Sequence, residues 1–389
     1  MAATALALAL LLPAACSSGE PGESGGTGTA AVPAASVPPN PPRPADCAPP
    51  PATDPTSADG WLGILAATPQ DVGLVADDGR GAVVSHAPDA QMPVASAAKI
   101  VHVAAYGRAV AEGRLRPDEQ VRIADWENWY LPSDGGAHAS ALDLLGIPRN
   151  GVVGAVDPNR TVTLQQMVIA IVQASDNAAT DYLRDRLGDQ ALLDAAAAGG
   201  WQGFDVPSEL GAQLALVRPQ EAPPLTAPRS VRGPAEHAMA QRFASDPAYR
   251  EDSRQRLVTL AQDVEAYVLE SERWAEATST GSAAQLAGMW RAVISGSFGP
   301  GADVARGELE VLGPRPDGQV RAFKGGSFPG VGTVAVSVRR PDGTIGVGVL
   351  LGRGFAPTID ANEVLVAQLR LLTEATEDPA ARARVLCVA

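Results

Sequence analysis

The sequence predicts an α+β fold, in which an antiparallel sheet built from N-terminal and C-terminal strands is flanked by helices and joined to an all-helical subdomain. Two hairpin patterns, at residues 71–86 and 333–352, each place two apolar runs around an Asp-Gly turn. The chain between them has mainly helical patterns. Strands at both ends with helices between them are typical of α+β proteins, and bring both ends of the folded chain to one side of the sheet.

The first 16 residues, MAATALALALLLPAAC, predict an export signal, because an apolar run ends in small residues before Cys16. The run is too short to anchor the chain as a membrane-spanning helix. The end of the run, LPAAC, is similar to a bacterial lipoprotein cleavage site, so we expect Cys16 to carry a lipid. Pro13 and the lack of any Lys or Arg before Cys16 depart from that pattern, and plain secretion is the alternative.

Residues 17–58 are rich in Pro, Gly, Ala and Ser, with almost no large apolar side chains. Such a segment cannot bury enough surface to offset the entropy lost on ordering, so we expect a disordered tether. The folded domain then comprises residues 59–389. Its ends carry Cys47 and Cys387, which we expect to form a disulfide in an oxidising compartment, closing a very long loop for about 4–5 kcal/mol. Two unpaired thiols are the alternative.

Two strong helices follow the first hairpin. The first covers residues 96–113, is rich in Ala and ends at Gly113, so Ser96 lies at or just before its N-terminus, where backbone N–H groups are unpaired. The second begins after Thr163, which has capping-box spacing to Gln166. The long connection between them, 126–150, holds three aromatic residues that serve either as core or as a lid: Trp126, Trp129 and Tyr130.

The C-terminal half has two further helical signals. An apolar stripe over residues 257–268 has helical spacing and predicts a core face, and a final amphipathic helix follows Asp360. The net charge of −14 and the absence of a Lys/Arg block exclude a nucleic-acid surface. We expect no metal and no cofactor, because four histidines lack metal-ligand spacing: His86, His102, His138 and His237.

The distribution of lysine points to a catalytic site. Of the 30 Lys and Arg residues only Lys99 and Lys324 are lysine, and each belongs to a short motif. Ser96-Ala97-Ala98-Lys99 opens the first helix, Ser175-Asp176-Asn177 ends the second, and Lys324-Gly325-Gly326-Ser327 enters the terminal hairpin. Positions i and i+3 share a helix face, so Lys99 can reach the Ser96 hydroxyl. A lysine whose pKa is lowered by burial or by a second cation can activate that hydroxyl, whereas an arginine stays protonated.

The three motifs, in this order, resemble those of the penicillin-recognising serine hydrolases, most closely the class A β-lactamase-like branch. The similarity extends over about residues 71–373 and implies a β-lactamase/transpeptidase-like fold. It implies that Ser96 is the nucleophile that forms an acyl-enzyme, that Lys99 is its base, and that Ser175 relays a proton to the leaving nitrogen. Asp176 is expected to be structural, through hydrogen bonds to the backbone.

The resemblance also implies the substrate-binding positions. Asn177 holds the substrate amide, and Lys324 supports Ser175 and a substrate carboxylate. Gly326 and Ser327 contribute the strand edge, and the backbone N–H groups of Ser96 and Ser327 form the oxyanion hole. In other enzymes the loss of one such donor costs about 3–4 kcal/mol of transition-state stabilisation.

Two features depart from that family pattern. The third motif normally has a hydroxyl residue after its lysine, where this chain has Gly325, although Ser327 could replace it. Class A enzymes hydrolyse their acyl-enzyme with a glutamate in a Glu-x-x-Leu-Asn context. Glu209 and Glu221 are the only glutamates of the corresponding region, and neither has that context. We therefore expect acylation to be better supported than rapid turnover.

The leading hypothesis is an exported serine acyl hydrolase of β-lactamase type, acting on β-lactams or related amides and esters. A peptidoglycan D,D-peptidase is the first alternative, and a cell-wall or β-lactam binding protein without turnover is the second. The expected partners are a small-molecule or peptidoglycan-derived substrate and, through a lipid on Cys16 alone, the cell membrane. We expect a monomer, located either at the membrane as a lipoprotein or outside the cell.

Overall fold

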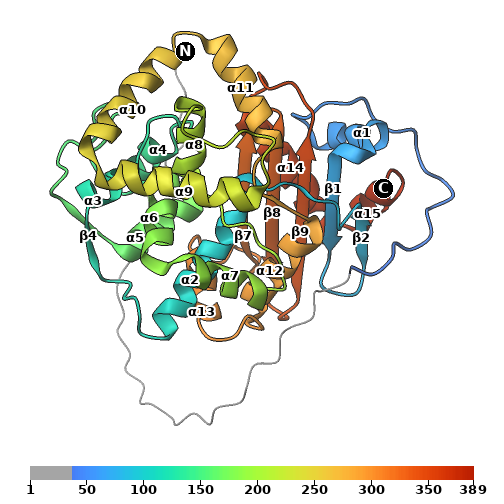
Figure 1. Cartoon of the computed structure of the whole chain (residues 1–389). Helices are drawn as coiled ribbons and strands as arrows, with labels where there is room; N and C mark the ends of the chain where they lie inside the picture. The colour runs from blue at the N-terminus through green and yellow to red at the C-terminus, as the bar shows by residue number, and fades with distance from the viewer. Residues whose placement is uncertain (1–36) are drawn as a thin grey trace, which may run out of the picture. The chain divides into compact units, whose positions relative to one another are not determined.

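The computed structural model describes residues 37–389, apart from three side chains between residues 264 and 276. The predicted export signal, Cys16 and the first part of the predicted tether lie outside the described residues. The architecture is mixed helix and antiparallel sheet, as the sequence predicts (Figure 1).

The central sheet has five antiparallel strands in the order β2-β1-β9-β8-β7. The N-terminal hairpin therefore pairs with the C-terminal strands through β1 and β9, as in the register Val75↔Val349. This arrangement confirms the prediction that both ends of the chain supply one sheet. The strands are β1 (Val72–Asp77), β2 (Val83–His86), β7 (Val320–Phe328), β8 (Val331–Arg339) and β9 (Ile345–Arg353).

Helices bury both faces of the sheet. Successive side chains of a strand point to opposite faces, so Val72 and Leu74 belong to one apolar cluster and Val75 to the other. The first cluster is completed by α1 (Ala58–Ala67), α14 (Ala361–Glu377) and α15 (Pro379–Leu386), and the second by α12 (Ala283–Ser295) and the helical subdomain. Both faces are dry, which explains why these strands are almost continuously apolar.

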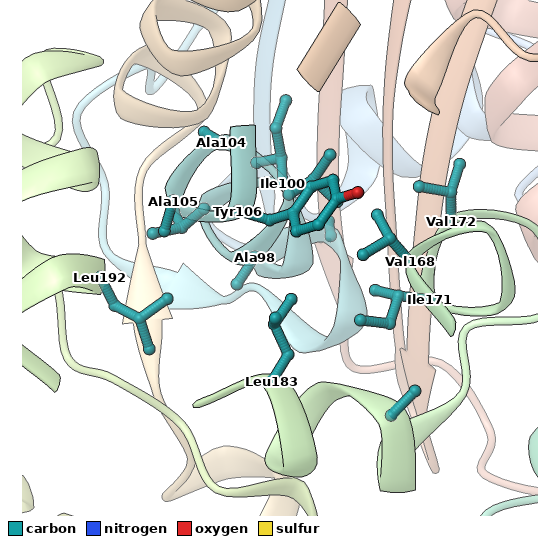
Figure 2. Close-up of a cluster of buried hydrophobic side chains, with 14 of the residues drawn as sticks. Ala98, Ile100, Ala104, Ala105, Tyr106, Val168, Ile171, Val172, Leu183 and Leu192 are labelled. Atoms are coloured by element: carbon teal, nitrogen blue, oxygen red, sulfur yellow. The ribbon is translucent and has the colours of Figure 1, made fainter. Parts of the chain in front are cut away.

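The helical subdomain is organised around α2 (Ile100–Ala111). The helices α5 (Leu164–Gln173), α6 (Asn177–Leu187) and α7 (Asp189–Ala198) contribute side chains to the cluster around α2. In Figure 2, Ile100 lies among side chains such as Ile171 and Leu183, which come from α5 and α6. The capping box of Thr163 and Gln166 is present at the start of α5. This packing fixes the two chain segments that carry the first two motifs.

Shorter elements connect these parts. Paired short strands are β3 (Met92–Pro93) with β6 (Thr280–Gly281), and β4 (Gln120–Arg122) with β5 (Thr161–Thr163). The remaining helices are η1 (Pro69–Asp71), η2 (Ala95–Lys99), α3 (Ile123–Glu127), α4 (Ala137–Leu144), α8 (Glu209–Val217), α9 (Arg229–Ser245), α10 (Pro247–Leu260), α11 (Val264–Glu276) and α13 (Ala302–Leu309).

The apolar stripe over 257–268 does not lie on one continuous helix. The chain turns at residues 261–263, so α10 ends at Leu260 and α11 starts in a new direction (Figure 1). Aspartate favours helix starts, and the Asp263 carbonyl accepts a hydrogen bond from the backbone N–H of Tyr267 in α11. The two halves of the stripe consequently form two helices rather than one core face.

The tether predicted for residues 17–58 ends earlier than expected. The Asn40 side chain exchanges two hydrogen bonds with the backbone of Ser85 in the edge strand β2, at 2.7 and 2.8 Å. Residues 51–54 pack directly on α1, where a Cβ on Gly60 would lie 2.0 Å from the Asp54 carbonyl oxygen. Composition predicts disorder for residues 37–58 because they have little apolar surface. Hydrogen bonds of Asn40 and a covalent link nevertheless attach this segment to the folded domain.

That covalent link is a disulfide between Cys47 and Cys387, whose Cα atoms are 5.5 Å apart. It ties the N-terminal segment to the end of α15. None of the helices in residues 37–389 combines the length and the hydropathy that a membrane span requires.

Candidate active site

Ser96 lies on the short 3-10 helix η2, immediately before α2. The sequence placed it at or just before the N-terminus of the long helix. It lies just before, because α2 begins at Ile100 and the chain first makes a tighter turn in which Ala95 has a left-handed φ of 43°. Strand β7 approaches this turn so closely that a Cβ on Gly326 would lie 2.3 Å from the backbone nitrogen of Ser96. Glycine at 326 is therefore required for β7 to reach the half-buried Ser96.

Lys99 is fully buried, and its ammonium group joins the first motif to the second. Its Nζ donates to the Ser175 carbonyl oxygen at 2.8 Å and to Oδ1 of Asn177. Oε1 of Glu209 lies 3.8 Å from the same Nζ. Two hydrogen bonds and one longer ion pair thus surround the ammonium, and Ser96 Oγ is not among its hydrogen-bond partners. Lys99 must therefore lose a proton before it can act as a base toward Ser96.

Lys324 joins the third motif to the second. Its Nζ donates to Ser175 Oγ and to the Gly325 carbonyl oxygen, each at 2.8 Å. Ser175 itself has a left-handed φ of 61°, a conformation that costs energy for a residue with a side chain. Strained backbone of this kind persists only where surrounding contacts impose it. Here both lysines impose it, one at the Ser175 carbonyl and one at its hydroxyl.

The pKa of Lys324 is strongly lowered. Burial lowers it first, and the positive charge of Lys99 lowers it further, so that it lies well below its ordinary value of 10.5. The sequence also predicts that Lys324 acts as a second cation on Lys99, and this stays a prediction. The lowered pKa brings Lys324 closer to the neutral form, in which it can exchange a proton with Ser175 Oγ.

Asp176, the middle residue of the second motif, is the buried anchor of this loop. It caps α6 by accepting a hydrogen bond from the backbone N–H of Ala179, and it also accepts one from Trp126 Nε1 at 3.0 Å. His138 Nδ1 lies 2.7 Å from its second carboxylate oxygen, and His138 Nε2 lies 3.3 Å from Glu127 Oε1. The connection 126–150 is thus tied to the second motif through a buried imidazole between two carboxylates.

The charge on that imidazole follows from its neighbours. Burial opposes protonation of His138, but the Asp176 carboxylate and the hydrogen bonds to Asp176 and Glu127 outweigh it and raise the pKa to about 9. At neutral pH both nitrogens are therefore donors, one to each carboxylate. Trp126, Trp129 and Tyr130 are buried in the core, so the aromatic residues of the connection are core rather than lid.

Glu209 is held beside Lys99 by the start of α8. Ser208 caps this helix through the backbone N–H of Gly211. The buried carboxylate of Asp181 accepts hydrogen bonds from Ser208 Oγ at 2.8 Å and from the backbone N–H of Leu210 at 2.6 Å. Asp181 therefore fixes Ser208 and Leu210, the residues on both sides of Glu209. Burial raises the pKa of Asp181 to about 6, although the hydrogen bond from Leu210 opposes this shift.

A cleft of about 790 Å³ opens over these groups, and Ser96, Ser175, Asn177, Glu209, Gly326 and Ser327 line it. We call Ser96, Lys99, Ser175, Lys324 and Glu209 the polar floor. The apolar walls are Leu216 of α8, Leu257 of α10, Trp274 of α11, Phe328 of β7, and Phe355, Ile359 and Leu365 before and within α14. Residues 132–137 of the connection also border the cleft.

The three motifs thus meet at one cleft. Two residues that the sequence did not assign to the site accompany them. Glu209 was set aside because it lacks the Glu-x-x-Leu-Asn context, yet it is the carboxylate beside Lys99. A cap residue, Ser208, precedes it and could have indicated a helix start pointing at the site. For His138 no local signal exists, since its partners are 38 and 11 residues away along the chain.

Comparisons with known proteins agree with this geometry. A family model described as a beta-lactamase enzyme family matches residues 62–300, more than half of the chain. A solved beta-lactamase structure from Sphaerobacter thermophilus DSM 20745 is 18% identical, with a TM-score of 0.50, over 80% of this chain and 94% of that one. One from Chitinophaga pinensis DSM 2588 is 14% identical, with a TM-score of 0.51, over 82% and 98%. At these identities the structures establish the fold alone. No curated protein gave a significant match.

Proposed function

The chain belongs to the beta-lactamase enzyme family, and from this premise we propose that it is an exported serine acyl hydrolase that forms an acyl-enzyme on Ser96. One observation carries the proposal. Both lysines of the chain converge on Ser175, with Lys99 Nζ 2.8 Å from its carbonyl oxygen and Lys324 Nζ 2.8 Å from its hydroxyl, at the cleft that Ser96 lines. Ser175 is 76 residues from Lys99 and 149 residues from Lys324 along the chain, so three distant segments must meet to form this arrangement.

Acylation begins once the Lys99 ammonium has released a proton to solvent, which leaves a neutral amine three residues from the nucleophile, and this amine takes the Ser96 hydroxyl proton. Ser96 Oγ attacks the carbonyl carbon, and the backbone N–H groups of Ser96 and Ser327 stabilise the oxyanion. The bond to the leaving nitrogen or oxygen breaks as Ser175 gives its proton to the leaving group. Ser175 is reprotonated through Lys324 by the proton that Lys99 took from Ser96, so that Glu209 remains a carboxylate throughout.

Deacylation needs a base that activates water against the ester on Ser96. Glu209 lines the same cleft as Ser96 and is nine-tenths buried, so its carboxylate is placed to take a proton from water that attacks the acyl carbonyl. The C–O bond to Ser96 then breaks, the acid product leaves, and the Ser96 oxygen regains a proton. This assignment favours turnover, and so favours a hydrolase over a D,D-peptidase or a binding protein that remains acylated.

The test combines intact-mass spectrometry with a chromogenic turnover assay. Incubation with a fluorophosphonate should add one adduct to the wild-type protein and none to Ser96→Ala. The wild-type protein should turn over a penicillin, and Ser96→Ala should neither turn it over nor retain it. Rapid colour release identifies a hydrolase, whereas a persistent penicillin adduct identifies a peptidase or a sensor. If neither reagent labels Ser96 in a folded protein, the proposed function is wrong.

Export is the second part of the proposal. The signal-like first 16 residues and the disulfide between Cys47 and Cys387 both support an oxidising, extracytoplasmic location. Lipidation of Cys16 would hold the domain at the membrane, and radiolabelled palmitate incorporation, compared between wild type and Cys16→Ser, tests it. Label on the wild type alone supports the lipoprotein, and no label leaves plain secretion. A small-molecule or peptidoglycan-derived acyl donor is the proposed partner.

A further inference from the structure

The charged groups that border the cleft are all acidic. Among the described residues that line it, Asp134 and Glu209 are the charged side chains, and neither arginine nor lysine is present. Both carboxylate oxygens of Asp134 accept backbone hydrogen bonds, from the N–H groups of Gly136 and His138. The described lining therefore holds no cation that could pair with a negative ligand.

Lys99 and Lys324 lie behind the residues that line the cleft, and each already contacts polar groups of the protein. Lys99 is fully buried against Glu209 and Asn177. Lys324 is 4% exposed and donates to Ser175 Oγ and to the Gly325 carbonyl oxygen, and burial and the charge of Lys99 lower its pKa. Neither amine is left to balance a negative ligand in the cleft.

Arg229, which borders a cavity with Glu209, is equally occupied. Arg229 borders a small cavity of about 10 Å³ behind Glu209, not the cleft itself. Its guanidinium donates to Asp205 Oδ2 at 2.6 Å and to Glu236 Oε2 at 2.8 Å. Two carboxylates therefore already balance this cation.

The strand edge lacks a hydroxyl at the position after Lys324. A Cβ on Gly325 would lie 3.2 Å from Leu365 Cδ1, so an apolar side chain of α14 already presses on the space that a longer residue would enter. Leu365 also lines the cleft. At this position an anionic group would need a hydrogen-bond donor, and it meets the apolar Leu365 side chain instead.

The walls offer a large apolar surface instead. Trp274 and Phe328 meet edge to face with ring centroids 4.7 Å apart, and Phe355 and Ile359 extend the same lining. Leu216 and Leu257 come from α8 and α10, so helices and sheet both contribute. A volume near 790 Å³ with such walls accommodates an extended apolar acyl or leaving group.

We infer that the substrates of this site are neutral or cationic acyl esters or amides with a large apolar group, and that a carboxylate beside the scissile bond is selected against. The inference rests on the proposed function, because it assumes acyl transfer to Ser96. Its basis is electrostatic and steric: the lining offers a bound carboxylate no cation, and the strand has no hydroxyl directly after Lys324, whereas an apolar group would contact the walls.

The experiment compares benzylpenicillin with its methyl ester, which differs only in the neutralised carboxylate. Ser96 acylation is followed by intact mass at several reagent concentrations, with fluorophosphonate labelling of the same protein as the control for a working nucleophile. We expect the methyl ester to acylate Ser96 at least tenfold faster than the free acid. Equal rates, or a faster free acid, would overturn the inference and leave acyl transfer intact. A protein that no fluorophosphonate labels would overturn the proposed function instead.

A matched pair of variants tests the cause. Asn362 is exposed at the cleft border, so Asn362→Lys adds one cation and Asn362→Gln adds none. We expect Asn362→Lys to reduce the ester-to-acid rate ratio severalfold and Asn362→Gln to leave it at the wild-type value. A ratio that Asn362→Lys does not change would show that charge in the cleft does not set the preference, and would overturn the inference.

Discussion

The polar floor and the apolar walls of the cleft differ in how they are held. The charged floor residues Lys99, Lys324 and Glu209 are buried, and polar contacts connect the floor: Lys99 contacts Ser175, Asn177 and Glu209, and Lys324 donates to the Ser175 hydroxyl. The wall residues come from α8, α10, α11, β7 and α14 and contact one another mainly through apolar surface. Hydrogen bonds therefore hold the groups that transfer protons, and the shape of the apolar walls selects the substrate.

This contrast gives a rule for interpreting variants. A change in the floor should reduce the reaction of every acyl donor, because the same proton transfers serve all of them. A change in the walls should alter the relative rates of different donors and leave the smallest donor unaffected. The predictions below use that rule, and each would weaken it if the two regions behaved alike.

Replacement of Lys99 should have the largest effect on the rate of acylation. In Lys99→Arg the guanidinium keeps its proton, so the amine base is lost, and we expect acylation by every donor to fall by about 10²–10⁴-fold. The measurement is the rate of fluorophosphonate and penicillin adduct formation on Ser96, followed by mass. An arginine variant that keeps most of its acylation rate would refute the base assignment.

A folding control is needed because Lys99 is fully buried. Lys99→Met keeps a similar length without charge, and Glu209 then loses its ion-pair partner. Circular dichroism and thermal melting of both variants distinguish loss of chemistry from loss of structure. A folded Lys99→Met protein that still acylates would contradict the role given to the amine.

Glu209→Gln should separate the two half-reactions. The amide keeps the shape of the side chain and cannot take a proton from water, so we expect deacylation to slow by about 10²-fold. A penicillin adduct on Ser96 should then persist where the wild-type protein shows only turnover. Glu221→Gln is the matched control, because Glu221 pairs with Arg218 and Arg242 away from the cleft lining. If both variants turn over at the wild-type rate, Glu209 is not the base.

The sequence predicted the floor better than the walls for a physical reason. Ser96 and Lys99 belong to one turn, and Ser175, Asp176 and Asn177 to one loop, so their chemistry can be inferred from local spacing. The antiparallel sheet was predictable as well, because short apolar runs on both sides of an Asp-Gly turn are local patterns.

Pairings between distant segments could not be predicted. Glu209 carries no motif, and only the packing of α8 against α6, through Asp181, brings it to Lys99. The turn at 261–263 redirects α11 so that Trp274 reaches Phe328, a contact that helical spacing alone does not indicate. Residues 37–57 were expected to be disordered because composition reports apolar burial, and does not report a disulfide or asparagine hydrogen bonds to an edge strand.

His138, which anchors the second motif through Asp176, should make the free energy of unfolding depend on pH. His138 has a folded-state pKa of about 9 against about 6.5 when unfolded, so the native state holds the extra proton between these values. The stabilisation is fully present below pH 6.5 and is lost as the pH rises through 9. Because a tenfold difference in proton affinity corresponds to about 1.4 kcal/mol, the loss is of order 3 kcal/mol in the free energy of unfolding.

Asp181 acts in the same direction at lower pH. Its folded-state pKa of about 6 exceeds the ordinary 3.8, so the fold favours the protonated acid, and stability falls as the pH rises through about 4 to 6. Urea unfolding between pH 4 and 10 measures both effects. His138→Gln should flatten the curve between pH 6.5 and 9 and leave the lower segment, and Asp181→Asn should do the reverse. A wild-type curve that rises from pH 6.5 to 9 would contradict the charge assigned to His138.

The smallest predicted effect belongs to the walls. Leu216 is half-buried on α8 and faces the cleft, so Leu216→Ala removes apolar contact with a long acyl group and leaves the floor in place. The lost contact is worth about 1 kcal/mol, so we expect kcat/KM for a p-nitrophenyl octanoate to fall severalfold. The acetate ester does not reach this wall, and its rate should be unchanged. Leu216→Met, which conserves volume, should keep both rates. An equal loss for both esters in Leu216→Ala would mean that α8 acts through Glu209, so that this wall and the floor form one unit.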